Sequence, residues 1–172
     1  SSYQGLIDNL IAIRDAATQL AGDNNLGERE RVAAEVARIK DFMSQRRVVI
    51  LEMFSRQTYE PSQRTAYTGT QAGEDLAEAN FAKVANRFER DLFQQIVAGP
   101  KLRESDTYQG IMNGKNDDDI KDLQFNSTEW DTALREHGDL VRQVEARLDE
   151  GIVAEATELR DEVQRQVLIE TG

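Results

Sequence analysis

Apolar side chains recur along this chain at the alternating three- and four-residue steps of a single helical face. The clearest run has seven members: Val32, Val36, Ile39, Met43, Arg46, Ile50 and Met53. Residues with this spacing lie on one side of an α-helix, so the run predicts a long helix with one buried face. Arg46 is the exception, because it brings a fixed positive charge into an apolar seam. Such a cation needs an anion, a hydrogen-bond acceptor or water beside it, since burying a charge alone is costly.

Two further stripes have the same period and extend the helical prediction to both ends of the chain. Their members are Trp130, Leu134, His137, Val141, Val144 and Leu148, and Tyr3, Leu6, Leu10, Ile13, Ala17 and Leu20. The 172 residues include only two prolines and 11 glycines, and they show no strand pattern. We therefore predict one all-α domain over residues 1–172, an antiparallel helical bundle of about four long helices plus one short helix.

Turn residues set the expected helix boundaries. Residues 22–25 (GDNN) are typical of a turn, and Asn25 with Glu28 resembles a helix-capping pair. Pro61 and Pro100 mark two further breaks, because proline is accepted in the first turn of a helix but not in its interior. The expected helices cover about residues 2–21, 26–57, 61–98, 101–112 and 127–169. An even number of long helices places both chain ends on the same side.

Composition excludes several classes of function. The net charge of -11 argues against a nucleic-acid partner and against docking on anionic lipid, because both require a basic face. The chain has no cysteine, so disulfides and thiolate chemistry are excluded. It contains no run of about 18 apolar residues that would predict a membrane span.

Arg46 leaves three interpretations open. Its aliphatic stem could cover the core while the charged head reaches water, or the guanidinium could pair with a carboxylate of the bundle. It could instead offer a fork of donors to a small oxyanion, which the planar guanidinium suits. Gln45 and Arg47 flank it and could add donors. Arg14 would converge with Arg46 if the first two helices pack together, and is otherwise an ordinary boundary arginine.

His137 is either a histidine at the core edge or a switchable donor to a ligand. A metal site is not expected, because one histidine without cysteine leaves only carboxylates. Residues 117–119 (DDD) lack the frame of an EF-hand and are expected to form a solvated loop. No nucleophile, base and oxyanion donors can be named together, so we predict no enzyme activity and no cofactor.

Several stretches, taken in order, resemble the nitrate- and nitrite-sensing (NIT) domain in the extracytoplasmic part of actinobacterial sensor histidine kinases, including the kinase-like proteins of conservon operons. The stretches are YQGLIDNL (3–10), IKDFMSQR (39–46), QAGEDLAEANF (71–81), VAGP (97–100), and Trp130 with LVRQVE (140–145). The resemblance covers most of the chain, and it depends on the series and its spacing rather than on any single motif.

The resemblance implies an all-helical sensor between two transmembrane helices, with nitrate or nitrite held by arginines. Gln45-Arg46 matches the glutamine-arginine pair of the family, so Arg46 is the position carried over. The family domain usually has further helices before the segment matching Tyr3, including one with a Glu-Arg motif. No segment matching those helices precedes Tyr3 in this sequence, so we expect either that it is a fragment of the longer family domain or that this receptor has lost half of the presumed pocket.

We therefore expect the ligand-sensing domain of a two-component sensor histidine kinase, on the extracytoplasmic face of the membrane. A small oxyanion such as nitrate or nitrite is the expected ligand, with Arg46, Arg47, Gln45, Arg14 and His137 as candidate contacts. Signalling would proceed by helix displacement in a membrane-anchored parent receptor that forms a homodimer. The alternative is a helical dimerisation or protein-interaction module of the same receptor with no small-molecule ligand.

Overall fold

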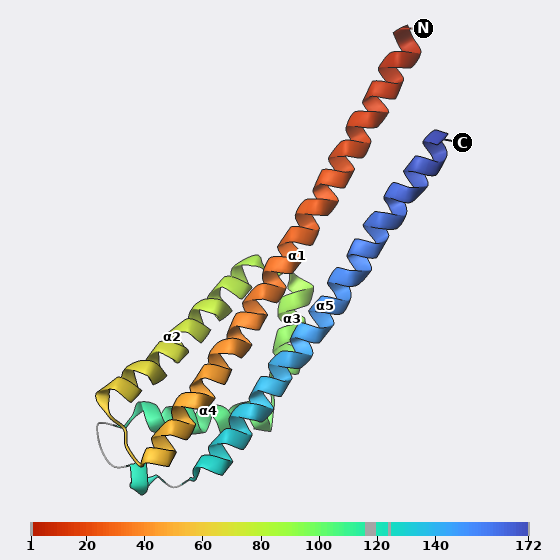
Figure 1. Cartoon of the computed structure of the whole chain (residues 1–172). Helices are drawn as coiled ribbons and strands as arrows, with labels where there is room; N and C mark the ends of the chain where they lie inside the picture. Colours follow the sequence, from red (N-terminus) through yellow and green to blue (C-terminus); the bar gives the residue numbers. More distant parts are fainter. Residues whose placement is uncertain (1, 116–119, 124, 172) are drawn as a thin grey trace.

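The computed structural model describes residues 2–115, 120–123 and 125–171, and within these ranges the chain contains helices and no strand. The elements are α1 (Ser2–Arg56), α2 (Pro61–Val84), α3 (Arg87–Ile96), α4 (Pro100–Asn113), the 3-10 helix η1 (Ile120–Asp122) and α5 (Ser127–Thr171). The all-α prediction is confirmed. Both chain ends lie at the same end of the molecule, as the sequence predicted (Figure 1).

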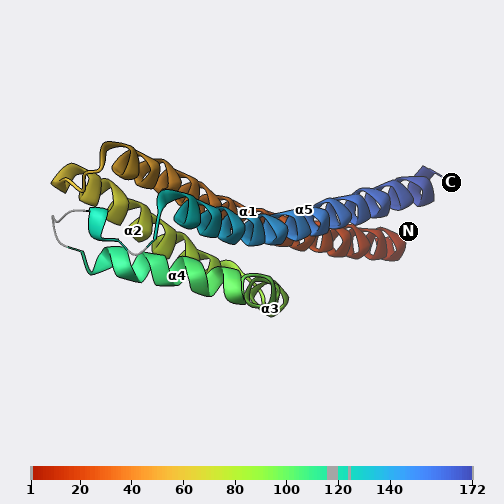
Figure 2. The same ribbon diagram turned by 90° about the horizontal axis from the view of Figure 1, so that it is seen from below.

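The two longest helices form the frame of the fold. α1 and α5 have 55 and 45 residues and run antiparallel, side by side, while the remaining helices gather at the end away from the termini (Figures 1 and 2). We call this end the bundle. The other end, made of residues 2–25 of α1 and 156–171 of α5, projects beyond α2, α3 and α4, and we call it the stalk.

The predicted turn at residues 22–25 is wrong, because α1 continues through it as one helix. Contacts with α5 explain the difference. The side-chain amide of Asn25 donates to Glu155, and Leu159 lies so close to Gly22 that an added Cβ would come within 2.6 Å of its Cδ2 atom. Tertiary packing therefore overrides the local preference of these residues for a turn.

A single helix over residues 61–98 is also wrong, because the chain breaks at Ala85 and Asn86. Asn86 caps α3: its side chain accepts a hydrogen bond from the Glu89 backbone N–H at 2.8 Å, and the Glu89 carboxylate accepts one from the Asn86 backbone N–H at 2.8 Å. This reciprocal capping box begins a new helix. The expected four long helices thus become two long ones, α2 with 24 residues, and the shorter α3 and α4.

Two apolar clusters fill the bundle. One joins the first part of the Val32–Met53 stripe to α2, α3 and α5, and the other joins its last part to α4, η1 and the start of α5. The Val32–Met53 stripe and the Trp130–Leu148 stripe are buried at every position, which confirms these two predicted core faces. The Tyr3–Leu20 stripe is exposed. Arg46 lies on α1 between the two clusters, where it is 1% exposed.

Two further findings concern the described residues alone. None of the helices is both long and apolar enough to cross a membrane. No group of His, Asp and Glu side chains among them is arranged to hold a metal ion. The aspartates of residues 117–119, expected to be solvated, lie outside the described residues.

Candidate functional site

Arg46 is held entirely by protein groups. Its Nε donates to Thr70 Oγ1 at 3.3 Å, its Nη1 to Gln109 Oε1 at 3.2 Å, and its Nη2 forms an ion pair with Glu74. The partners come from α2 and α4, so the guanidinium ties three helices together. Of the three interpretations that the sequence left open, this geometry corresponds to the one in which the guanidinium pairs with a carboxylate of the bundle.

The charge of Arg46 is compensated where it lies. Burial raises the pKa of Glu74, while the neighbouring Arg46 guanidinium opposes this rise by favouring the ionised carboxylate. Each nitrogen of Arg46 already has an acceptor, and the residue is only 1% exposed, so an anion in solvent has no open approach to the guanidinium in this arrangement. A ligand role for Arg46 stays a prediction, and its geometry favours a structural role.

Gln45 and Arg14 lie apart from the Arg46 pair. Gln45 is exposed and donates to Asp41 Oδ2 at 2.9 Å on the same helix. Arg14 is exposed in the stalk, where its Nη2 lies 3.7 Å from Asp15 Oδ1. Because Arg14 and Arg46 belong to one continuous helix, about 48 Å separates them along its axis, and they do not converge.

His137 is buried on α5, with its Nδ1 3.2 Å from Ser105 Oγ of α4. Burial lowers the pKa of His137, Asp106 opposes this, and Arg46 lowers it further. The neutral ring therefore prevails near pH 7 and shares a hydrogen bond with Ser105. This arrangement is the core-edge histidine that the sequence offered as one alternative.

Arg47 differs from Arg46 because it reaches the surface. Its Nε donates to Asp131 Oδ1 at 2.8 Å and its Nη2 to Asp131 Oδ2 at 3.2 Å, a bidentate pair between α1 and α5. This hydrogen bonding raises the pKa of Arg47 above its usual value. A guanidinium has five N–H groups, so the pair with Asp131 leaves donors free for a further acceptor.

Arg47 also lines a small hollow between α1 and α5, which we call the α1–α5 hollow. Its volume is about 40 Å³, which suits a ligand the size of about three water molecules. Four basic side chains and one acidic side chain surround it. The lining residues are Lys40, Met43, Ser44, Arg47, Leu134, Arg135, Gly138, Asp139 and Arg142.

The basic residues of the hollow are only partly neutralised. Lys40 donates to Glu145 at 2.8 Å, and Arg142 lies 4.0 Å from Asp139. Arg135 is exposed and makes no ion pair with any residue that the structure describes. In a chain with a net charge of -11, this concentration of positive charge makes the α1–α5 hollow chemically suited to a small anion.

Of the hollow's basic residues, the sequence pointed only to Arg47. Lys40, Ser44 and Arg47 follow one another at steps of four and three, and Arg135, Gly138 and Arg142 at steps of three and four. Each set is therefore a polar row beside a buried stripe. The sequence signal was the presence of two polar rows with helical spacing. These rows can be identified as a site only once α1 and α5 are known to lie side by side.

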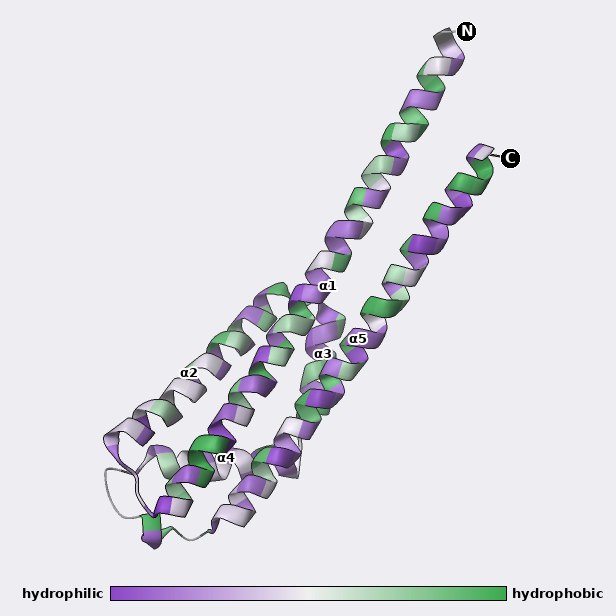
Figure 3. Ribbon diagram, viewed as in Figure 1, coloured by the Kyte–Doolittle hydropathy of each residue, from purple (hydrophilic) through white to green (hydrophobic). Residues whose placement is uncertain are grey.

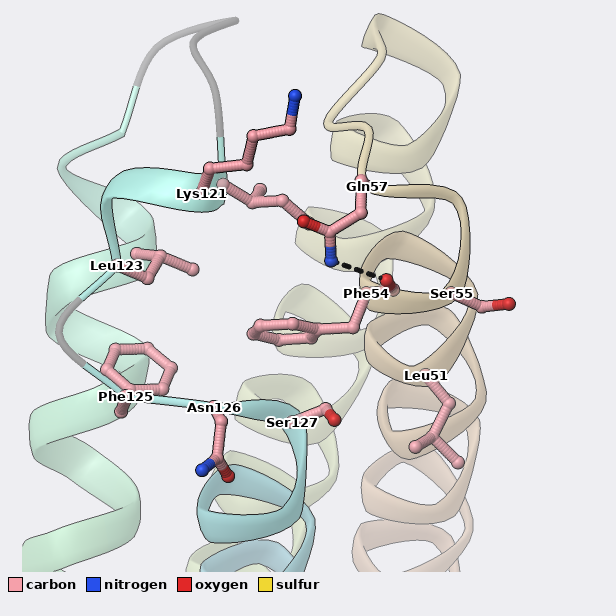
Figure 4. A pocket seen from close by; sticks show the side chains of 10 residues that line it. Leu51, Phe54, Ser55, Gln57, Lys121, Leu123, Phe125, Asn126 and Ser127 are labelled. Carbon is pink, nitrogen blue, oxygen red and sulfur yellow. Dashed lines mark hydrogen bonds between the residues drawn. The ribbon is translucent and has the colours of Figure 1, made fainter.

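A larger cavity of about 550 Å³ lies at the far end of the bundle, where α1 ends and α5 begins. Figure 4 shows that Phe54, Leu123 and Phe125 line it, with Gln57 donating to the Phe54 carbonyl at 2.7 Å. Its walls are partly apolar, and Lys121 is the one cation among its described lining residues, whereas a small oxyanion needs several charged donors. This cavity is not the candidate anion site.

The fold and the α1–α5 hollow together define the class of protein: an all-helical domain with a small hollow, lined by basic side chains, between its two longest helices. A family model described as nitrate and nitrite sensing (NIT) matches residues 1–153, and the chain belongs to this family. No curated protein and no solved structure gave a match. The family match does not favour the alternative of an interaction module without a small ligand.

Proposed function

We propose that this domain senses nitrate or nitrite by binding the anion in the α1–α5 hollow. The observation that carries the proposal is the convergence of Arg47 and Lys40 from α1 with Arg135 and Arg142 from α5 around an ion-sized space. Guanidinium groups suit planar oxyanions, because two parallel N–H groups can donate to two oxygens at once. Membership in the nitrate- and nitrite-sensing family supports the same ligand class.

Binding in this hollow would act on the contact between α1 and α5. Arg47 is tied to Asp131 and Lys40 to Glu145, and both pairs cross from one helix to the other. An anion competes with these carboxylates for the same donors. The ligand would thereby favour one relative position of the two helices, by an amount set by its difference in affinity for the two arrangements.

The position of the chain ends suits signalling out of the domain. α1 and α5 both lead from the hollow to the same end of the molecule (Figure 1). We infer that the domain is the extracytoplasmic part of a membrane-anchored receptor, a sensor histidine kinase, and that the stalk transmits a displacement of α5 against α1. The domain itself acts as a receptor rather than as an enzyme.

Calorimetric titration with sodium nitrate and sodium nitrite tests the ligand and the site together. Arg135→Ala is the informative variant, because this side chain is exposed and its loss breaks no ion pair of the described structure. We expect it to weaken nitrate binding by about tenfold, as for the loss of one charge-assisted hydrogen bond. Arg160→Ala is the matched control, since Arg160 is also an exposed arginine of α5 but lies outside the hollow.

Sodium chloride at the same concentration controls for ionic strength. Equal heats for nitrate and chloride would refute oxyanion recognition. Unchanged nitrate affinity in Arg135→Ala, with the wild type binding nitrate, would place the site elsewhere.

A further inference from the structure

The stalk of α1 carries an apolar face that nothing in the described chain covers. Its members are Tyr3, Leu6, Leu10, Ile13, Ala17 and Leu20, which we call the stalk stripe. Tyr3 is 72% exposed, Leu10 58% and Ile13 66%, whereas the stripe that continues the same helix in the bundle is buried. In Figure 3, green apolar bands alternate with purple polar ones along the upper part of α1, as expected for a helix with one apolar face.

The stalk stripe faces away from α5. The residues of α1 that approach α5 are others: Asp15, Thr18 and Gln19 line a narrow space with Leu159 and Val163 of α5, and Gly22 lies against Leu159. At 3.6 residues per turn, these positions fall on roughly the opposite side of α1 from the stripe. The stripe therefore needs an occupant that is not another part of this fold.

The spacing of the stripe is compatible with a second copy of this helix as the occupant. Steps of three and four alternate without interruption from Tyr3 to Leu20, which is the a and d pattern of a heptad repeat. Two helices with this pattern are complementary to each other, because the side chains of each fit the spaces left by the other. A copy of the same helix supplies such a pattern in the same register.

The charges of this segment permit a contact between copies. The chain has 32 acidic residues, yet only Asp8 and Asp15 fall within the first 22 positions, and both lie on the side of α1 away from the stripe. The residues flanking the stripe include a single charge, Arg14. Like-charge repulsion, which this acidic protein would meet almost anywhere else on its surface, is thus avoided here.

We propose that two copies of this chain pack through the stalk stripe as a parallel two-stranded coiled coil. The parallel direction rests on the proposed function: it places both bundles at one end and all four chain ends at the other, as anchoring in one membrane requires. Covering the stripes of two copies removes on the order of 1,000 Å² from water, near the lower limit for a specific interface. Tethering in the parent receptor strengthens such a contact by raising the effective concentration.

Single-cysteine cross-linking tests this contact directly, because the chain has no cysteine of its own. Leu6→Cys and Ile13→Cys place a thiol at d positions, where the two copies of a parallel coiled coil approach each other. Under mild oxidation we expect both variants to form disulfide-linked dimers. Asp8→Cys, on the other side of the same helix turn, is the matched control and is expected to form no disulfide-linked dimer.

The double variant Leu6→Glu with Ile13→Glu serves as the second arm. Both side chains are exposed, so the fold should survive, and sedimentation at high protein concentration should show loss of the dimer. Equal cross-linking of Leu6→Cys and Asp8→Cys, or a dimer unaffected by the double variant, would overturn the proposal. Cross-linking of Leu6→Cys to Ala17→Cys alone would show antiparallel pairing and overturn the parallel arrangement.

The coiled coil and the binding of nitrate can be refuted separately. Nitrate calorimetry on the double variant reads the α1–α5 hollow, which lies in the bundle and shares no residue with the stalk stripe. A wild-type protein that stays monomeric at high concentration but binds nitrate would refute only the coiled coil. A wild-type dimer that binds no nitrate would refute only the ligand.

Discussion

The two halves of α1 have the same apolar spacing and opposite surroundings. From Val32 to Met53 the stripe is buried against α2, α4 and α5, whereas from Tyr3 to Leu20 it is exposed. Periodicity therefore identifies which face of a helix is apolar but not what covers it. In the bundle the cover is the rest of the chain, and in the stalk we infer that it is a second copy.

An arginine is buried in the bundle half of α1 and another is exposed in its stalk half. Replacing these two residues gives the largest expected difference in stability. Arg46→Ala leaves the Glu74 carboxylate buried without its partner and should cost about 3–5 kcal/mol of unfolding free energy. Arg14→Ala removes an exposed side chain and should leave the urea midpoint unchanged within error. Urea unfolding of the two variants measures the difference.

A double variant separates the ion pair from the packing at this position. Arg46→Met with Glu74→Leu removes both charges, and replacing a buried pair by apolar side chains is often neutral or stabilising. Recovery of most of the lost stability would confirm that the cost of Arg46→Ala is the orphaned carboxylate. A double variant as unstable as Arg46→Ala would show that the hydrogen bonds to Thr70 and Gln109 matter more.

The second effect compares two apolar residues of α1. Ile50 is fully buried, so Ile50→Ala should cost about 2–5 kcal/mol through lost burial and the cavity left behind. Leu10 is 58% exposed in one copy, so Leu10→Ala should change the stability of dilute monomer by less than about 0.5 kcal/mol. A large loss for Leu10→Ala at low protein concentration would mean that the stalk stripe is covered by the monomer itself.

The contrast between the halves also decides how much of the fold could be predicted. The buried stripes were predictable, because their period survives in the structure at every position. The continuity of α1 was not, since residues 22–25 favour a turn by composition and become helical only against Leu159 and Glu155 of α5. The break before α3 does have a local signal in the sequence, the capping pair of Asn86 and Glu89, although no break was predicted there.

The candidate site was predictable only in part, for a similar reason. Arg46 stood out because a charge in an apolar stripe is unusual. Its partner Glu74 lies on another helix, and nothing in the sequence distinguishes Glu74 from the other acidic residues of the chain. Arg135 and Arg142 did not stand out, because arginines on an exposed helical row are ordinary. Their significance depends on the pairing of α1 with α5, which a single sequence does not specify.

The third effect concerns two glycines. A Cβ on Gly73 of α2 would overlap the ring of Phe42 on α1, so Gly73→Ala should destabilise the bundle by about 1–3 kcal/mol through overpacking. Gly27 of α1 lies near the start of the bundle, where a Cβ would meet nothing within 4 Å. Gly27→Ala should therefore stabilise the protein by up to about 1 kcal/mol, the usual helix cost of glycine.

Thermal unfolding of both alanine variants measures the expected loss of stability in Gly73→Ala and the expected gain in Gly27→Ala. The close approach of α1 and α2 at Gly73 argues against free sliding between these helices, because the Phe42 ring occupies the space that the glycine leaves. If Gly73→Ala were as stable as the wild type, the Phe42 ring would have an alternative position and the contact would be looser than its geometry indicates.

The smallest effect is a pH dependence that belongs to the bundle alone. Glu78 is an exposed residue, but partial desolvation of its carboxyl, followed by the charges of Glu74, Asp75 and Asp106, raises the pKa of Glu78 to about 7 from an ordinary value of 4.5. The folded protein therefore keeps a proton that the unfolded chain releases between pH 4.5 and 7. Stability is fully retained below this window and declines as the pH rises through it.

Glu78→Gln removes the titrating group while keeping the shape of the side chain. Its urea midpoint should match that of the wild type at pH 4 and exceed it at pH 8, because only the wild type then bears the unfavourable charge. Asp8→Asn in the stalk is the control, since it removes a carboxylate far from this acidic group and should leave the pH profile unchanged. Midpoints of the wild type and Glu78→Gln that differ by a constant amount from pH 4 to pH 8 would show that Glu78 titrates normally in the folded protein.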